Sequence, residues 1–515
     1  MTISQPDITI NIIPAASTIS NEPQKVLFIG QKVVGGTAIA DALEANIGNN
    51  GEENALFGAT SMLAQMIRAA RALNGVTQFD AIPLDDNGSG VDATGTIAFT
   101  GPSTEAGTLD VTIGSGLNYK LSIVIASGDT ATDIGDAVDT AIAALTDAPF
   151  TSSNTTGTVT FTAVNAGTVG NGFVLKVEGS VAGVATVVTG MASGATDPVL
   201  TSLFDVIDGE RYQTIVWPGG YVTSELTTLL DARFNVSNDV LDGVGILTLS
   251  DTFSNIQTAA NALNSASVTM LGNKLLSDAQ HKGGALVEFS DVLSAKFAAV
   301  RALRLTEGAN ISQFVISTNG ARDSFGGAAI ASLPYFNTPF ANLSIIDRGK
   351  GFSTTEIESL LTAGASTLAN NKTRTSIISG EIATTRKTDS AGNVETTFHF
   401  LNAVDTSSAI REFYFNNLRK RFAQSRLTEG DLQPNRNMAN QVVIESFLDS
   451  LYQKLSGEDF VLTQDGTTAV KFFKANRTVS LNLETGTVTI NMKMPIVTQL
   501  RTIVATIQIA FSTEG

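Results

Sequence analysis

Polar and apolar residues alternate with a period of two near both ends of the chain. This alternation predicts short strands over residues 7–12 and 501–511. Each is either an edge strand of the chain's own core or a strand that pairs with a neighbouring copy, and the pattern leaves both options open. The apolar side chains along these two segments include Ile8, Ile10, Ile12, Ile503, Ile507 and Ile509.

Between the two ends, buried strands and amphipathic helices follow one another at short intervals. The apolar run 25–30 is typical of a buried strand, and the apolar spacing within 57–75 predicts a helix. A strand over 78–84 follows. After residue 198 the alternation resumes, with strands over 212–217, 245–250 and 267–271 and helices over 224–232, 253–263 and 285–305. This order favours a sheet covered by helices.

A cluster of turn-forming residues at 85–90 marks a change in composition. From there to about residue 195 the chain is rich in Thr, Gly and Val. One helix is predicted, with Asp129 or Thr130 as its N-cap. Strands are predicted over 94–100, 107–113, 119–125, 157–164 and 172–177. We therefore expect a β-rich module inserted into the α/β unit, with its two ends close together.

The last third of the chain again mixes helices and strands. Ser353 and Glu356 match a capping box that opens a helix over 354–362. Longer helices are predicted over 404–426 and 438–455, and strands over 343–346, 374–379, 396–401, 478–483 and 486–494. The predicted fold class is multidomain α/β (α+β), with a helix-covered sheet core, an inserted β-rich domain and extended terminal strand arms.

The patterns divide the chain into five parts. They are an N-terminal arm (1–20), an α/β core domain (21–90 and 198–338), an inserted β-rich domain (91–197), a C-terminal α/β domain (339–499) and a C-terminal strand arm (500–515).

The composition narrows the chemistry that the chain can perform. Of 515 residues, none is cysteine and two are histidine, which excludes disulfides and leaves little for metal ligation or histidine catalysis. The first residues lack the basic and apolar segments of a signal peptide, and no apolar run is long enough to span a membrane. We expect a protein that is assembled in the cytoplasm and uses no cofactor or metal.

The charge is strongly negative and unevenly distributed. The net charge of −17 repels the phosphate backbone and argues against direct binding to nucleic acid. Residues 91–197 contain ten acidic and two basic residues, hence a net charge of −8. This segment is expected to face solvent.

One stretch resembles a phosphate-binding loop. It runs from Gly30 to Thr37 after an apolar strand, but Gly36 occupies the position that requires lysine, and Lys32 lies inside the loop. An ordinary glycine-rich turn is the better interpretation, and a nucleotide-binding α/β enzyme that uses this loop is the alternative.

Other candidate sites are weaker. His281 is expected in a surface loop and His399 at an exposed strand position, because neither has a partner at metal-binding spacing. The cluster from Asp85 to Gly88 lacks the spacing and terminal glutamate of a calcium loop, so a turn is expected.

Basic residues gather along the helix predicted over 404–426. Cations near a helix C-terminus are favoured by the helix dipole and usually face solvent. The alternative is a contact with an acidic surface on another subunit or on an inner protein. The residues concerned are Arg411, Arg419, Lys420, Arg421 and Arg426.

Several stretches resemble the sheath proteins of contractile phage tails, in particular the Mu-like tail sheath family. They are MTISQPDITINIIPA, LFGATSMLAQMIRAARALN, the module segments that begin GVDATGTIAFTGPS and GTVTFTAVNAGTVG, and LRTIVATIQIAF. The matches occur in this order along nearly the whole chain, and their order carries the resemblance.

The resemblance implies a structural protein that is not an enzyme. Sheath subunits of this family form hexameric rings stacked helically around an inner tail tube, and their terminal arms add strands to sheets in neighbouring subunits. The sheath contracts to drive the tube through the bacterial envelope, using free energy stored at assembly. The inserted domain would lie on the outside, and the basic residues would face the tube.

The resemblance also implies further partners and leaves alternatives. Baseplate and tail terminator proteins would bind the ends of the sheath, in a virion tail assembled in the host cytoplasm. A tail-like bacteriocin or a secretion apparatus would use the same kind of subunit. A surface adhesin with a β-rich module is a third possibility, against which the missing signal sequence weighs.

Overall fold

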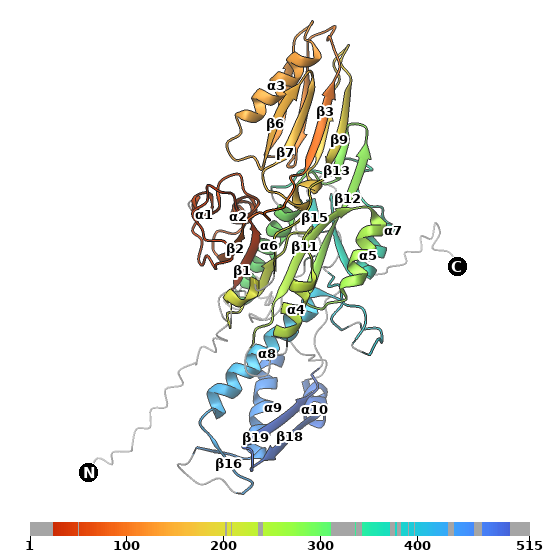
Figure 1. Ribbon diagram of the computed structural model, residues 1–515. Helices are drawn as coiled ribbons and strands as arrows, with labels where there is room; N and C mark the ends of the chain where they lie inside the picture. The colour runs from red at the N-terminus through yellow and green to blue at the C-terminus, as the bar shows by residue number, and fades with distance from the viewer. Residues whose placement is uncertain are drawn as a thin grey trace, which may run out of the picture.

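The structure is a computed structural model that describes residues 24–49, 51–200, 203–207, 209–234, 240–310, 335, 342–370, 376–378, 383–389, 391–395, 397–430, 437–457 and 466–494. These residues form an elongated molecule with the inserted module at one end and a helical module at the other (Figure 1). The predicted arm strands, with Ile8, Ile10, Ile12, Ile503, Ile507 and Ile509, lie outside the described residues.

A parallel sheet occupies the centre of the molecule, in the order β2-β1-β10-β11-β12-β14. Its strands are largely buried because helices cover both faces. Strand order reverses between β1 and β10, since the chain adds β2 on one side of β1 and β10 on the other. The strands are β1 Lys25–Gln31, β2 Gln78–Leu84, β10 Thr214–Val216, β11 Val244–Asp251, β12 Val268–Asp278, β14 Ala365–Asn370 and the antiparallel β15 Ser376–Ile378.

Helices cover the two faces of this sheet in separate groups. Thr248 of β11 accepts a hydrogen bond from Ser294 of α6 at 2.9 Å, whereas Gly245 of the same strand faces Leu226 of α4. Since residues of opposite parity in a strand point to opposite faces, α6 and α4 lie on opposite faces. The helices of the core are α1 Glu52–Phe57, α2 Met62–Arg71, α4 Ser224–Arg233, α5 Phe253–Leu263, α6 Ser290–Asn310 and α7 Thr354–Ala363, with the 3-10 helix η2 Leu203–Ile207.

The inserted module begins and ends at one point, where Val91 pairs with Ala195 in an antiparallel bridge. Four of its strands form a separate antiparallel sheet in the order β6-β7-β3-β9, and β8, β4 and β5 extend the central sheet through β13 (His281–Gly284). Its elements are β3 Thr94–Phe99, β4 Gly107–Ile113, β5 Lys120–Ile125, α3 Ala131–Ala143, β6 Phe150–Thr155, β7 Thr158–Ala163, η1 Thr168–Gly172, β8 Leu175–Glu178 and β9 Thr186–Ala192.

Residues 401–494 form a module that we call the C-terminal module. It has its own hydrophobic cluster, in which the rings of Tyr452 and Phe473 stack with centroids 4.2 Å apart. In contrast, β14 and β15 join the central sheet, and α7 packs against β14. The predicted division places all three elements in the C-terminal domain. The module contains α8 Leu401–Phe422, β16 Arg426–Leu427, β17 Met438–Ala439, α9 Gln441–Gly457, α10 Gly466–Ala475, β18 Arg477–Asn482 and β19 Thr487–Met492.

Local signals located several elements well. The predicted strand 78–84 and helix 253–263 have the predicted bounds, and the capping box of Ser353 and Glu356 is confirmed. Thr130 is the N-cap of α3 and forms a second capping box with Asp133.

Two predicted strands are wrong, and one predicted helix is present but ends earlier than expected. Residues 343–346 pair with no strand among the described residues, and of 397–400 only Phe400 makes a bridge, to Ala383. The helix predicted over 404–426 ends at Phe422, because Arg426 pairs with Met438 in the short parallel sheet β16-β17.

Candidate assembly surfaces

The glycine-rich loop after β1 is occupied by contacts within the chain. Lys32 pairs with Asp85 at 2.8 Å, so its ammonium group already has a carboxylate partner. A Cβ on Gly36 would lie 2.5 Å from the carbonyl oxygen of Leu56, which shows how tightly the loop packs. The adjacent Asp86 adds a second carboxylate, and two carboxylates repel a phosphate group. The loop therefore acts as a structural turn.

The crevice at the reversal of strand order is also filled by the chain itself. Ligands of doubly wound sheets usually bind there. In this chain, Gln31 donates to the carbonyl oxygen of Ala166 at 2.6 Å and accepts from the hydroxyl of Tyr221 at 2.8 Å. Asn165 donates to the carbonyl oxygen of Lys32 at 3.0 Å. The base of the inserted module thus occupies the ligand position.

An open pocket of about 240 Å³ remains beside this crevice, where η1 meets the loop after β10. Ser250, Ser290 and Asp291 line one side of it. The Asp291 carboxyl is buried at the start of α6, and burial raises its pKa to about 7, to which the charge of Glu288 adds. Burial of this carboxyl therefore opposes folding when the carboxyl is ionised, at the junction between core and insert.

The turn from Asp85 to Gly88 likewise uses its side chains internally. Asp86 accepts hydrogen bonds from Gln31 at 2.5 Å and from Asn165 at 3.1 Å. Asn87 accepts from the amide of Ser89 at 3.1 Å, as expected of a turn. Within the part of the chain that the structure describes, no three His, Asp or Glu side chains form a metal-binding group.

Both histidines differ from their predicted environments. His281 is 5% exposed rather than in a surface loop, because β13 lies between β12 and β8. Its Nε2 lies 3.1 Å from the carbonyl oxygen of Gly284, and burial lowers its pKa. His399 lies in a turn and is half-buried against Phe400, with ring centroids 4.7 Å apart.

The five predicted basic residues separate into two groups. Arg411 is half-buried and forms an ion pair with Asp242 of the core. Arg419, Lys420 and Arg421 are exposed at the C-terminal end of α8. Because successive helical residues are rotated by about 100°, these three side chains surround the helix end.

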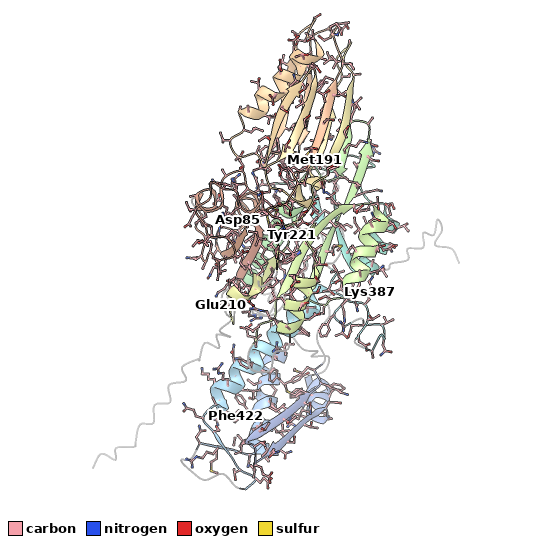
Figure 2. The ribbon with its side chains drawn as sticks, in the orientation of Figure 1. Asp85, Met191, Glu210, Tyr221, Lys387 and Phe422 are labelled. Atoms are coloured by element: carbon pink, nitrogen blue, oxygen red, sulfur yellow. The ribbon has the colours of Figure 1, made fainter. Side chains whose placement is uncertain are left out.

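The fifth basic residue, Arg426, is exposed in β16 just beyond the helix. Aromatic rings lie beside the exposed guanidinium groups, with Arg419 5.9 Å from the Phe415 ring centroid and Arg421 5.7 Å from that of Phe422. Figure 2 shows Phe422 in the C-terminal module, far from Met191 in the insert. We call Arg419, Lys420, Arg421 and Arg426 the basic cluster.

A two-stranded sheet on the C-terminal module has edges that pair with no further strand among the described residues. Strands β18 and β19 pair antiparallel from Arg477↔Met492 to Asn482↔Thr487, and neither pairs with another described strand. Val479 is buried on the module's hydrophobic cluster, and Leu481 and Ile490 pack against the same cluster. An edge strand presents unpaired backbone groups to which another strand can bond. The sheet is a ready acceptor for additional strands.

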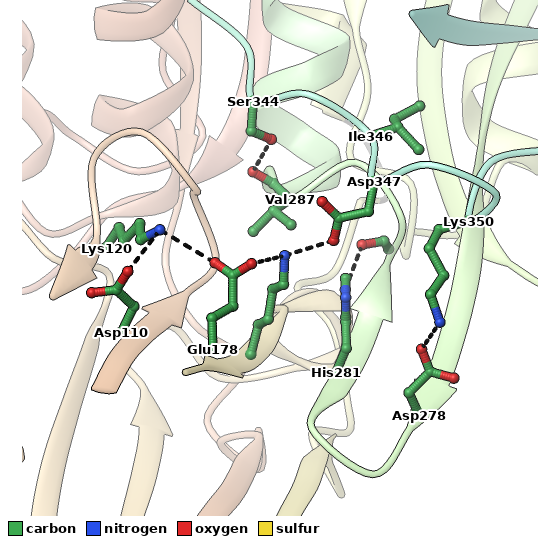
Figure 3. A network of polar contacts seen from close by, with 12 residues as sticks. Asp110, Lys120, Glu178, Asp278, His281, Val287, Ser344, Ile346, Asp347 and Lys350 are labelled. Carbon is green, nitrogen blue, oxygen red and sulfur yellow. Dashed lines mark hydrogen bonds and ion pairs between the residues drawn. The ribbon is translucent and has the colours of Figure 1, made fainter. Parts of the chain in front are cut away.

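The inserted module is acidic because it has ten acidic residues and two lysines, and each lysine pairs with two carboxylates. Lys120 pairs with Asp110 at 3.0 Å and with Glu178 at 3.3 Å, and Lys176 pairs with Glu178 at 3.0 Å and with Asp347 of the core at 2.8 Å. Figure 3 shows this chain of alternating charges. The remaining carboxylates of the module, including those along α3, have no lysine from the module itself.

The acidic module and the basic cluster lie at opposite ends of the molecule (Figure 1). Among the described helices none is long and apolar enough to cross a membrane. Together with the filled crevice, this arrangement defines a multidomain α/β protein.

Comparison with known proteins adds a specific relationship. No family model matches the chain. The chain is 30% identical over 249 residues to the Mu-like prophage FluMu tail sheath protein of Haemophilus influenzae, a match that spans 47% of this chain and 50% of that protein. The match confirms the predicted resemblance to Mu-like tail sheath proteins, and the chain covers about half the length of this relative.

Two solved structures share less sequence identity with the chain. A sheath tail protein from Desulfitobacterium hafniense shares 11% identity with a TM-score of 0.45, over 95% of this chain and 100% of that one. The contracted helical sheath of the anti-feeding prophage shares 11% identity with a TM-score of 0.44, over 99% of both chains. The name of the Haemophilus relative is that of a structural protein, in agreement with the prediction that the chain is not an enzyme.

Proposed function

We propose that the chain is a structural subunit of a contractile tail sheath, which polymerises around an inner tube and contracts to drive that tube through the bacterial envelope. The observation that carries the proposal is the 30% identity over 249 residues to a Mu-like tail sheath protein. The function needs no catalytic residue or cofactor, because the free energy of contraction is stored when the lattice assembles.

Strand addition between copies would hold the lattice together. The arms at 1–20 and 500–515 supply strands, with Ile8, Ile10, Ile12, Ile503, Ile507 and Ile509 in alternate positions. The open edges of β18 and β19 support this proposal, because each arm could bond to one edge and turn its apolar face toward the hydrophobic cluster of the module. Each added backbone hydrogen bond contributes about 1 kcal/mol.

The distribution of charge supports a radial orientation of the subunit. The acidic inserted domain would lie on the outside of the sheath, and the C-terminal module would face the tube at the opposite end of the molecule (Figure 1). The basic cluster of Arg419, Lys420, Arg421 and Arg426 is the proposed contact with an acidic tube surface. Arg411 takes no part in it, because its charge is paired with Asp242 inside the chain.

The proposed partners follow from this architecture. Copies of the chain form hexameric rings that stack helically, the tail tube protein fills the centre, and baseplate and terminator proteins bind the two ends. The assembly belongs to a virion tail and forms in the host cytoplasm without contacting the genome directly. A tail-like bacteriocin or a secretion apparatus is the alternative, and the genes beside this one separate these cases.

Electron microscopy of the expressed full chain tests the proposal. We expect regular tubes from the wild-type protein. Ile507→Asp places a charge on the apolar face of the C-terminal arm and should abolish the tubes while leaving a folded monomer. The matched variant Thr506→Asp adds the same charge on the other face and should still form tubes. Absence of tubes from the wild type, or equal assembly of both variants, would overturn the strand-addition proposal.

Charge reversal tests the tube contact separately. Lys420→Glu/Arg421→Glu should prevent the chain from coating the tail tube protein when the two are co-expressed, while tubes of the chain alone still form. The control Arg348→Glu/Lys471→Glu changes the net charge equally at exposed positions outside the basic cluster. If both double variants coat the tube equally well, the basic cluster does not make the contact.

A further inference from the structure

Helix α8 belongs to two hydrophobic cores at once. Leu401 and Val404 in its first turn pack in the core around the central sheet, whereas Ile410 and Phe413 pack in the cluster of the C-terminal module. The helix has 22 residues and is about 33 Å long. It runs from the central sheet into the C-terminal module (Figure 1). The direction of α8 relative to the central sheet therefore determines the position of the C-terminal module.

Along its first half, α8 also meets the core through charged side chains. Arg301 of α6 pairs with Asp405 at 2.5 Å, and both side chains are 3% exposed. Arg301 also donates to the carbonyl oxygen of Gln213 at 2.6 Å and to the hydroxyl of Thr214, at the start of β10. The hydroxyl of Tyr335 reaches Asp405 at 3.4 Å. One guanidinium group thus links α6, β10 and α8.

A second level of contacts lies one to two turns further along α8. Arg211 pairs with Glu412 at 2.6 Å and donates to Ser408 at 3.2 Å. Ser408 donates to Asp242 at 3.0 Å, and Arg411 pairs with the same carboxylate. Asp405, Ser408 and Glu412 follow a spacing of three and four residues, which places them along one side of the helix.

The first described residues of the chain enter at the same place. The backbone amide of Lys25 donates to the side chain of Gln213 at 2.8 Å, and the carbonyl oxygen of Gln213 is an acceptor of Arg301. Gln24 lines a cavity of about 40 Å³ together with Arg301 and Asp405. The start of β1 and helix α8, which belongs to the same module as β18 and β19, therefore meet near Arg301.

Buried ion pairs are suited to fixing an orientation rather than to adding stability. Removing two charges from water opposes folding, so a buried pair generally stabilises no more than apolar side chains of similar size. Its geometry is directional, because guanidinium and carboxylate groups must align to form hydrogen bonds. An apolar contact has no such preference in angle. The role of the charged and polar side chains along α8 is therefore to orient the helix on the core rather than to stabilise the fold.

We propose that Arg301 and Asp405, supported by the pairs of Arg211 and Arg411, are positioning residues that fix the angle between the C-terminal module and the core. The inference rests on the proposed function in one respect: this angle determines where β18 and β19 meet the arms of neighbouring copies. Through Gln213, the same contacts also connect Lys25, the first residue of β1, to α8.

Distance measurements in the monomer test the proposal directly. The chain has no cysteine, so Ser254→Cys on α5 and Ser446→Cys on α9 give two unique spin-label sites, both exposed. In the wild-type background we expect a narrow distribution of distances between the labels. In Arg301→Met/Asp405→Leu we expect a broader or displaced distribution, with a urea unfolding midpoint that is unchanged or raised. Arg301→Met alone should lower the midpoint, because Asp405 is left buried without its partner.

A matched control removes an ion pair at the other end of the core. Lys350 and Asp278 form a pair whose side chains are 42% and 49% exposed. Lys350→Met/Asp278→Leu should leave the distance distribution unchanged. Equal widths and centres for wild type, control and Arg301→Met/Asp405→Leu would overturn the proposal.

Electron microscopy connects the angle to assembly. Arg301→Met/Asp405→Leu should form no ordered tubes or tubes of altered helical symmetry, whereas the control variant should assemble as the wild type does. If the wild type itself forms no tubes, the proposed function fails, and the distance distributions still decide whether Arg301 and Asp405 set the angle. A variant with a broadened distribution and wild-type tubes would refute the link between angle and assembly.

Discussion

The inserted domain and the C-terminal module are joined to the core by different kinds of contact. The sheet continues from β12 through β13 into β8, and Phe289 just before α6 and Val292 within α6 belong to the hydrophobic cluster of the insert. The C-terminal module meets the core along α8, where the polar contacts include the buried pairs of Arg301 and Arg211. Many backbone and apolar contacts fix the first junction, whereas a few charged side chains align the second.

The difference predicts how each junction responds to substitution. Truncating a buried apolar side chain removes transfer energy and leaves a cavity, so the insert junction should lose stability. Exchanging charged pairs for apolar ones should leave stability nearly unchanged at α8 and alter the angle instead. In a contractile lattice this would combine an outer domain of fixed orientation with an inner module whose angle is set by specific pairs.

The largest effect is expected for Phe289→Ala. The Phe289 ring packs against Phe173, with centroids 4.6 Å apart, and against Tyr119 at 6.1 Å. Gly114, with φ +68°, leaves room for this ring, since a Cβ there would lie 2.0 Å from it. Truncation should lower the free energy of unfolding by about 3–5 kcal/mol, measured by urea denaturation.

A matched aromatic outside both junctions provides the control for this variant. Phe472 on α10 is 46% exposed, and Phe472→Ala should change the free energy of unfolding by less than about 0.5 kcal/mol. A loss below about 1 kcal/mol for Phe289→Ala would show that the apolar contacts do not hold the insert.

The next effect is a pH dependence of stability at the same junction. Burial raises the pKa of Asp291 from 3.8 to about 7, so between these pH values the folded chain keeps a proton that the unfolded chain has released. Stability should therefore fall as the pH rises from about 4 to about 7, by at most about 4 kcal/mol from this group. Asp291→Asn should remove this part of the slope, measured as urea midpoints across the range. An unchanged slope would mean that Asp291 keeps its charge when the chain folds.

A smaller effect is expected at α8 for Asp242→Asn. The substitution keeps the shape of the side chain and can still accept from Ser408, but it removes the charge that pairs with Arg411. Arg411 is 24% exposed and partly hydrated, so the free energy of unfolding should fall by about 1–3 kcal/mol, as measured in urea. The control Glu225→Gln, at an exposed position of α4, should have no measurable effect. A loss equal to that of Phe289→Ala would remove the distinction between the two junctions.

Local signals in the sequence predicted the core better than the junctions. The apolar runs of β1 and β2 and the caps of α3 and α7 depend on neighbouring residues, and they were located from the sequence. The strand β6, with the sequence FTSSNT, was missed because its inward face also carries polar residues, Ser152 and Asn154, so the segment shows no apolar–polar alternation. The four residues of β13 become a strand because β12 and β8 pair with them, which no local pattern indicates.

The candidate site was predicted only in outline. The sequence indicated the basic residues of α8 but not that Arg411 faces Asp242, since that pairing joins positions 169 residues apart. Asp405, Ser408 and Glu412 follow helical spacing, but this is the usual pattern of a solvent-exposed helix face. Their partners Arg301 and Arg211 come from the core, so only the tertiary structure shows that this face is buried. The predicted arm residues lie outside the described part of the chain.

The smallest effect on stability is expected for the partly exposed ion pairs between the insert and the core. Lys176 joins Glu178 of the insert to Asp347 of the core, but these carboxylates are 40% and 49% exposed (Figure 3). Burial alone would lower the pKa of Lys176, and its hydrogen bonds to Asp347 and Glu178 outweigh burial and raise it. The contribution of Lys176 is therefore complete at neutral pH and is lost only as the pH rises through this raised pKa.

Because water and salt screen these pairs, Lys176→Met should lower the free energy of unfolding by less than about 1 kcal/mol. The difference from the wild type should shrink further in high salt, measured by urea denaturation at two salt concentrations. Lys120→Met, which removes the other lysine of the network, should cause a similarly small, salt-dependent loss of stability. A loss as large as that of Phe289→Ala would mean that the surface charges, rather than the ring of Phe289, hold the insert on the core.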